Sequence, residues 1–176
     1  MGTMPDEQDR IEILPYDPVW VRKYEEARTE LLNALGEEVR SIEHIGSTAV
    51  PGLPAKPIID ILLSLDVCPP HFHIIAALQR LGYEYLGEHG ITGRYFFRKG
   101  IPRSHHLHAV QPGSDLWTKH IRFRDLLRAG PALCAEYSSL KVGLARRFGE
   151  DRQSYTNAKG DFIRRAIGSL ENGPPS

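Results

Sequence analysis

The stretch that decides the fold is Ile42–Leu65, which reads IEHIGSTAVPGLPAKPIIDILLSL. A short apolar run leads into a small-residue turn at Gly46 and Ser47, and a connector rich in proline and glycine follows. The second apolar run, 58–65, predicts a strand that is buried on both faces. Its one acid, Asp60, requires an explanation, because an apolar interior tolerates a carboxylate only when the carboxylate is paired or binds a cation.

The turn and the acid together suggest an explanation in phosphate chemistry. Small residues at a strand-to-helix turn leave backbone N–H groups free to bind phosphate oxygens. A carboxylate on the next strand can hold a magnesium ion that bridges those phosphates. The sequence therefore predicts that Gly46 and Ser47 contact phosphate and that Asp60, which follows after a connector of 12 residues, binds the metal. A plain turn at the end of a strand is the alternative.

Five blocks of the chain carry a family resemblance. They read EHIGSTAVPGL at 43–53, KPIIDI at 56–61, HHLH at 105–108, FRDLLR at 123–128 and YTNAK at 155–159. In these blocks the chain resembles the GrpB family of the nucleotidyltransferase superfamily, and the resemblance extends over nearly all of the sequence. It implies a nucleotidyltransferase-like fold, binding of a nucleoside triphosphate with a divalent metal, and transfer of a nucleotidyl group to an acceptor that the sequence does not identify.

One position departs from the pattern of the superfamily. The first two acids of that pattern lie two residues apart on one strand, so both side chains share a face and bind the same metal ions. The corresponding partner of Asp60 is Leu62, which cannot bind a hard cation. This departure favours, as an alternative, a catalytically inactive module that binds a nucleotide or a coenzyme. Some proteins that resemble the family carry the domain fused to dephospho-CoA kinase, which points to coenzyme A metabolism by association.

Histidines replace the third acid of the superfamily, which lies on a later strand. His106 and His108 share a face of the strand predicted at 103–110, with side chains roughly 6–7 Å apart. Together with Asp60 they would form a ligand set for manganese or zinc; magnesium or manganese is the metal that we expect. We assign the catalytic roles to Asp60 and His106. A metal-dependent hydrolase that uses Asp60, His106 and His108 is a further alternative, and histidines hydrogen-bonded within a sheet are the structural one.

Five further side chains are candidates for contact with the nucleotide. Arg94 and Arg98 have the same strand parity and could line a phosphate pocket. Tyr155 and Lys159 are four residues apart on a predicted helix, where the ring could stack on a base and the ammonium group could meet a phosphate. Lys56 precedes the central strand and could also reach phosphate. The structural alternatives are a solvated strand face, a core tyrosine beside a snorkelling lysine, and an exposed loop lysine.

Other polar residues receive structural interpretations. His44, which precedes the turn, is expected to support it. The charged run that contains Arg124 and Arg128 is expected to be a solvated helix surface. Surface positions are expected for four other histidines: His71, His73, His89 and His120.

The order of the periodic segments predicts an α+β fold in a single domain over residues 11–170, between polar tails at 1–10 and 171–176. A mixed sheet with flanking helices, nucleotidyltransferase-like by resemblance, would be followed by a helical C-terminal third. The last three strands would form an antiparallel meander. Strands are expected at 11–14, 39–45, 58–65, 83–87, 93–99 and 103–110, and helices at about 18–35, 69–81, 115–129, 131–148 and 152–170.

Composition sets the broad class. The 176 residues include 22 Lys and Arg and 22 Asp and Glu, so the net charge is zero and nothing favours general attraction to nucleic acid or to a membrane surface. The two cysteines, Cys68 and Cys134, lack metal-ligand or disulfide spacing and indicate a reducing cytoplasm. No apolar run approaches the roughly 20 residues that span a bilayer. The expected partner is therefore a nucleotide or a similar small molecule.

Overall fold

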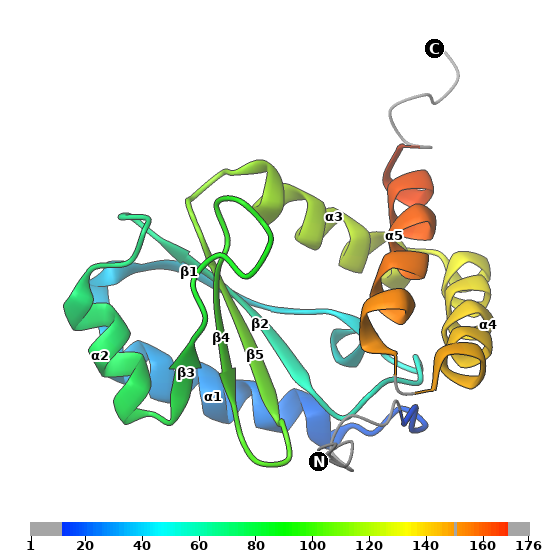
Figure 1. The fold of residues 1–176 in the computed structure, drawn as a ribbon, viewed down its shortest axis with the longest axis horizontal. Helices are drawn as coiled ribbons and strands as arrows, with labels where there is room; N and C mark the ends of the chain where they lie inside the picture. The colour runs from blue at the N-terminus through cyan, green and yellow to red at the C-terminus, as the bar shows by residue number, and fades with distance from the viewer. Residues whose placement is uncertain (1–11, 150, 169–176) are drawn as a thin grey trace, which may run out of the picture.

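The computed structural model describes residues 12–149 and 151–168. Its strands are β1 (Val39–Ile45), β2 (Ile59–Leu65), β3 (Tyr83–Tyr85), β4 (Tyr95–Lys99) and β5 (His105–Val110). They form one mixed sheet in the order β1-β2-β5-β4-β3, with helices on both faces (Figure 1). β1 is antiparallel to β2, β2 is parallel to β5, and β3, β4 and β5 form an antiparallel meander. The predicted α+β class, mixed sheet and meander are confirmed.

The helices in the described part of the chain are α1 (Val19–Leu35), α2 (Phe72–Arg80), α3 (Asp115–Ala129), α4 (Pro131–Phe148) and α5 (Arg152–Gly168). Their bounds lie close to the predicted ranges. The strand predicted at 11–14 is reduced to one bridge between Leu14 and Ala55. Residue 11, the predicted helix end at 170 and both tails lie outside the described residues. None of the described helices is long and apolar enough to cross a membrane.

One face of the sheet is closed by α1 and α2. Side chains alternate between the two faces along a strand, so Ile59, Ile61 and Leu63 of β2 all point to this face. They are fully buried, together with Phe97 of β4 and Leu107 of β5. This face is the main apolar core of the protein.

α2 packs on this core through Ile74, Ala77 and Leu78, which recur at helical spacing. Phe72 is 82% exposed, because it is the first residue of α2 and lies off the stripe that these three residues define.

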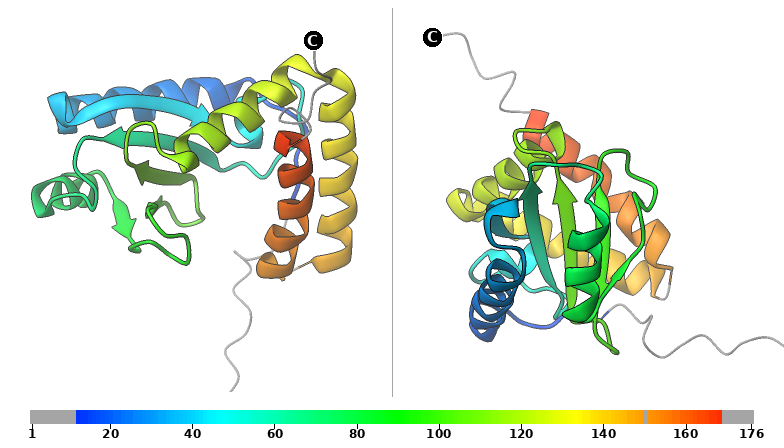
Figure 2. Two further views of the ribbon diagram at one scale, coloured as in Figure 1. Left: turned by 90° about the horizontal axis from the view of Figure 1, so that it is seen from above. Right: turned by 90° about the vertical axis from the view of Figure 1, so that its left-hand side faces the viewer.

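The opposite face of the sheet is covered only in part. α3 closes one section of it through an apolar cluster that contains Ile45, Leu62, Val110, Leu116, Trp117 and Ile121. Asp60 and His106 lie on the same face outside this cluster and are partly exposed. α4 and α5 stand beside the sheet at the end where β1 finishes and β2 begins (Figure 2). They pack there against Val50 and Leu53 of the connector.

Candidate functional site

Asp60 lies on β2, directly opposite His106 of the parallel strand β5. Its Oδ1 is 3.3 Å from Nδ1 of His106 and 3.4 Å from Nε2 of His108. Burial by itself would raise the pKa of Asp60, but hydrogen bonds from the two imidazoles outweigh burial and hold that pKa well below its usual range. The Asp60 side chain remains 28% exposed. The carboxylate is therefore ionised, paired and open to solvent.

Gly46 brings the predicted turn against this carboxylate. Ile45 at the end of β1 pairs with Asp60, so Gly46 follows directly beside it. A Cβ atom at Gly46 would lie 2.6 Å from Asp60 Oδ2, and the residue has φ 70°. Glycine is required here by both the close approach and the left-handed backbone. The two carboxylate oxygens thus face different neighbours, since Oδ1 meets the imidazoles and Oδ2 meets the turn.

His44 supports the turn, as the sequence predicted. A single 3₁₀ turn, Ser47–Ala49, follows Gly46, and Thr48 Oγ1 lies 2.9 Å from His44 Nε2. The His44 ring stacks on Tyr24 of α1 with centroids 4.7 Å apart. Burial lowers the pKa of His44 to about 4, so the ring is neutral at physiological pH. The Ser47 side chain reaches across to the phenol of Tyr137 on α4.

Three ammonium groups gather beside the turn, and we call Lys56, Lys141 and Lys159 the lysine cluster. Lys56 Nζ and Lys159 Nζ lie 4.7 and 4.3 Å from the ring centroid of Tyr155. Lys141 Nζ donates a hydrogen bond to the carbonyl of Pro54 and lies 5.1 Å from the ring centroid of Tyr137. The structure therefore places Lys56 beside Tyr155 and Lys159, which the sequence had proposed as a pair.

The lysine cluster is partly desolvated. Burial lowers the pKa of Lys159 to about 8, although the charge of Asp60 acts in the opposite direction. Burial, followed by the charge of Lys159, lowers the pKa of Lys141 to about 7. Tyr155 is fully buried beneath the ammonium groups, so it is a core tyrosine with a lysine beside it and not an open surface for stacking a base.

Arg94 and Arg98, the two predicted phosphate contacts near β4, both have protein partners. The Arg94 side chain is buried, and its Nη2 donates to the carbonyls of His89 and Glu88 at 2.8 and 3.3 Å. Arg98 lies opposite His106 in the β4–β5 register, and its Nε donates to Glu84 at 2.6 Å. Arg94 lies just before β4 and Arg98 lies within it, so the two guanidinium groups have different protein partners, and their contact with phosphate stays a prediction.

The sequence missed a stripe of α3 that faces the site. His120 was predicted to lie on the surface, yet its ring is 5.5 Å from that of His108 and burial lowers its pKa to about 4. Arg124 was predicted to be solvated, yet it is buried and its Nη1 donates to Glu43 at 2.6 Å and to the His44 carbonyl at 3.1 Å. Arg128 binds the Ala49 carbonyl through Nε and Nη2. The four-residue spacing of these side chains was the available signal.

The described residues test the fit of a metal. Within 12–149 and 151–168, no three His, Cys, Asp or Glu side chains are arranged so that they could hold an ion. Leu62, at the position of the second acid, is fully buried beneath α3. The residues therefore do not fit a pair of metal ions. They fit a single cation that shares Asp60 with phosphate oxygens, because magnesium commonly takes one or two protein carboxylates and completes its shell with phosphate and water.

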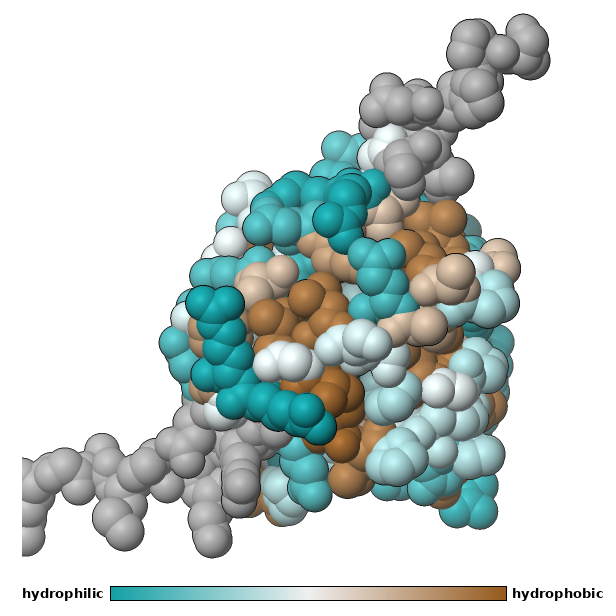
Figure 3. All heavy atoms as spheres, turned by 90° about the vertical axis from the view of Figure 1, so that its right-hand side faces the viewer, coloured by the Kyte–Doolittle hydropathy of each residue, from teal (hydrophilic) through white to brown (hydrophobic). Residues whose placement is uncertain are grey.

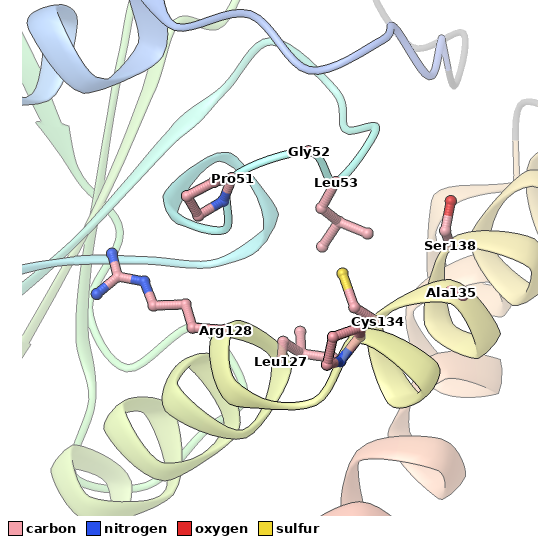
Figure 4. A pocket seen from close by; sticks show the side chains of 9 residues that line it. Pro51, Gly52, Leu53, Leu127, Arg128, Cys134, Ala135 and Ser138 are labelled. Carbon is pink, nitrogen blue, oxygen red and sulfur yellow. The ribbon is translucent and has the colours of Figure 1, made fainter.

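A pocket of about 530 Å³ lies elsewhere, between the connector and the junction of α3 and α4 (Figure 4). The guanidinium of Arg128 points away from it. Figure 3 shows apolar surface gathered on the side of the molecule that α4 and α5 form, surrounded by polar side chains. None of the predicted site residues lines this pocket, whose walls are Pro51, Gly52, Leu53, Leu127, Arg128, Pro131, Cys134, Ala135 and Ser138.

Two comparisons reach proteins with named biochemistry. A dephospho-CoA kinase of Mycolicibacterium paratuberculosis is 27% identical over 183 residues, which span 89% of this chain and 45% of that protein. A structure of Cid1 in complex with the UTP analogue UMPNPP superimposes with a TM-score of 0.41 at 15% identity, covering 83% of this chain and 48% of Cid1. This overlap is too low to carry a conclusion about function.

Closer matches settle the family. The family described as GrpB protein matches residues 10–168. A UPF0157 protein of Pseudomonas aeruginosa is 42% identical over 171 residues, covering 92% of this chain and 68% of the relative. The glutamate-rich protein GrpB of Alkalihalophilus pseudofirmus is 38% identical, covering 82% of this chain and 86% of the relative. The crystal structure of GrpB from Enterococcus faecalis superimposes with a TM-score of 0.81 at 36% identity, covering 90% of this chain and 99% of that one. The chain belongs to the GrpB family.

Proposed function

We propose that the protein binds a nucleoside triphosphate on the exposed part of the α3 face, with its phosphates between the Gly46–Ser47 turn and the lysine cluster. One observation carries the proposal: three ammonium groups from the connector, α4 and α5 gather beside a turn that touches Asp60. Asp60 is the carboxylate whose charge acts on Lys159. Desolvated ammonium groups in excess over carboxylates are suited to a ligand with several negative charges.

The proposal includes one divalent cation, magnesium or manganese, that enters with the triphosphate. When bound, such an ion neutralises phosphate charge. Asp60 would hold it through Oδ2, the oxygen that faces Gly46. His106 and His108 would act by fixing the carboxylate through Oδ1. A transition metal bound directly by Asp60, His106 and His108 is the competing arrangement, and it would serve the alternative of a metal-dependent hydrolase.

Two outcomes for the bound nucleotide remain to be distinguished by experiment. Transfer of a nucleotidyl group to an acceptor would make the protein an enzyme. A binding module without transfer is the second candidate, and the burial of Leu62 where a second acid would stand favours it. The similarity to dephospho-CoA kinases makes coenzyme A and dephospho-CoA the non-triphosphate ligands to include in the test.

Titration calorimetry tests the proposal. The ligands are the four ribonucleoside triphosphates, coenzyme A and dephospho-CoA, each with magnesium, with manganese and with EDTA, and zinc is titrated alone. We expect a triphosphate to bind, and Asp60→Asn to weaken that binding by about tenfold or more in the presence of metal. Lys99→Gln is the matched control, because Lys99 pairs with Glu30 of α1, on the face of the sheet opposite to Asp60. Absence of binding by the wild type would refute the proposal, and tight zinc binding would favour the hydrolase.

A further inference from the structure

We infer that His106 is the nucleophile of this site, and that its Nε2 takes a nucleotidyl group from the bound triphosphate to form a covalent intermediate. The inference rests on the proposed function, because it requires a triphosphate beside Asp60. It begins from a difference between the two imidazoles that contact the same carboxylate oxygen.

His106 contacts Asp60 through Nδ1, whereas His108 does so through Nε2. An ionised carboxylate only accepts hydrogen bonds, so the contacting nitrogen carries the hydrogen in each ring. With this hydrogen on Nδ1, the lone pair of the His106 ring lies on Nε2, the ring nitrogen that does not contact Asp60. The lone pair of His108 lies on Nδ1, which is buried and has no hydrogen-bond partner among the described residues. Only His106 thus presents a basic nitrogen outward.

Exposure and packing agree with this assignment. The side chain of His106 is 22% exposed and that of His108 is 11% exposed. The His106 ring meets Phe96 at 5.2 Å between centroids in an edge contact, which fixes its orientation together with the contact to Asp60. A nucleophile whose ring is oriented by a third group is the general arrangement of covalent catalysis.

The phosphates would lie over the same face of the sheet as Asp60 and His106. His106 and Gly46 flank this carboxylate from β5 and from the end of β1. The charge of Lys159 interacts with Asp60 from α5. A triphosphate held by the turn and the lysine cluster would therefore place a phosphorus atom within reach of the His106 ring. Because Leu62 leaves one carboxylate, the described residues hold no ligand set for activating an acceptor between two metals. A covalent route divides the transfer into two easier steps.

The proposed step balances as follows. The lone pair of His106 Nε2 attacks the α-phosphorus, a P–N bond forms, and the bond from that phosphorus to the bridging oxygen breaks. Pyrophosphate leaves with the electron pair. The Nδ1 hydrogen stays on the ring, where Asp60 stabilises the positive charge of the nucleotidyl-imidazole. An acceptor hydroxyl then attacks the same phosphorus, so that a P–O bond forms and the P–N bond breaks with its electron pair returning to Nε2. The hydroxyl proton passes to solvent, and the neutral imidazole is restored.

Trapping tests the inference without knowledge of the acceptor. The full chain is incubated with metal and with the triphosphate that binds in calorimetry, labelled at the α- or the γ-phosphorus. We expect α-label on the protein that is stable to alkali and labile to acid, a mass increase of one nucleotidyl group, and an equivalent amount of pyrophosphate. Peptide mass mapping of the wild type should place the group on His106.

His106→Asn should lose the label even at a nucleotide concentration that calorimetry shows to saturate the variant. His105→Asn is the matched control, because His105 faces the other side of β5 and contacts Ser104. Label from the γ-phosphorus, label on another residue, or no label at a saturating nucleotide concentration would overturn the inference and leave the proposed function standing. Absence of nucleotide binding in calorimetry would instead refute the proposed function, and this inference with it.

Discussion

The two faces of β2 differ in composition and in how completely helices cover them. Ile59, Ile61 and Leu63 point to the face that α1 and α2 close, and all are fully buried. Asp60 and Leu62 point to the other face, where α3 covers Leu62 and leaves Asp60 partly exposed. An apolar strand therefore does not define a sealed core. The length and position of the covering helix decide which residue of the strand meets solvent.

The largest expected effect comes from placing a second acid on the face of β2 that carries Asp60, two residues further along the strand. Leu62→Asp should lower the free energy of unfolding by about 4 kcal/mol or more, because it buries a carboxylate among Ile45, Val110 and Trp117. It should not create a second metal ligand. Urea unfolding of the variant, with and without manganese, measures both effects.

Leu62→Met is the matched control for this variant, and it should cost less than about 1.5 kcal/mol because it conserves volume. Near-wild-type stability of Leu62→Asp together with a gain of metal affinity would show that α3 can lift from the sheet. The contrast between the covered and open sections of this face would then be lost.

The ring of His44 lies on the face of β1 that α1 covers, and its titration provides the next test. The pKa of His44 falls from 6.5 to about 4 on folding because the ring is buried against Tyr24. The unfolded chain then binds more protons between pH 4 and 6.5, so stability is fully present above pH 6.5 and is lost as pH falls. At about 1.4 kcal/mol per pH unit, His44 contributes a loss of about 3 kcal/mol over this interval.

Chemical unfolding from pH 4 to pH 7 measures this contribution. His44→Gln should have a shallower pH dependence than the wild type, because glutamine does not titrate. His120, whose pKa is also about 4, keeps its share in both proteins. His73→Gln is the control, since His73 is exposed and pairs with Glu38 at the surface. Identical slopes for His44→Gln and the wild type would show that the ring is solvated on the folded protein.

Gly46 lies beside Asp60 at the end of β1, so its substitution should lower both the stability of the protein and its affinity for the nucleotide. Gly46→Ala places a Cβ 2.6 Å from Asp60 Oδ2 and requires alanine at φ 70°. We expect a stability loss of about 1–3 kcal/mol and a nucleotide affinity weaker by about tenfold or more. Gly52→Ala separates the causes, because Gly52 has φ 79° but no atom within 4 Å of the added Cβ. Equal loss of binding in both variants would assign the effect to the backbone of the connector.

The elements could be predicted because they depend on local signals. Asp17 and Gly36 lie at the ends of α1, where Asp17 accepts a hydrogen bond from the Val19 N–H and Gly36 has φ 55°. The period of two along β5 placed His106 and His108 on one face without any knowledge of tertiary packing. Their position beside Asp60 follows from the parallel register of β2 and β5, which no local signal gives.

The predictions that were wrong concern polar residues that only tertiary contacts can bury. Arg124 resembles a solvated helix residue until α3 is laid against β1, where Glu43 and a carbonyl satisfy it. His120 is half-buried because α3 brings its ring to 5.5 Å from that of His108. Lys141 was not considered, since nothing local indicates that the Pro54 carbonyl will accept its hydrogen bond. Long-range partners of this kind have no sequence period.

The smallest expected effect is the uptake of a proton by Lys159 of α5 when the nucleotide binds. The pKa of Lys159 is about 8, so the side chain is only about half protonated at pH 8. Phosphate oxygens beside the ammonium group would raise that pKa, and the complex would take up as much as about half a proton at this site. Calorimetry at pH 8 in buffers of different ionisation enthalpy measures the uptake directly.

Lys159→Gln should reduce this uptake and weaken binding by about tenfold, whereas Lys99→Gln should change neither. Lys141, whose pKa is about 7, is already largely neutral at pH 8 and can add to the uptake if phosphate reaches it. Repeating the titration at pH 6.5 provides the internal check, because Lys159 is then protonated before the nucleotide arrives and its share should vanish. If Lys159→Gln takes up as many protons as the wild type at pH 8, the phosphates do not lie against α5. Residues of the sheet alone would then bind the ligand.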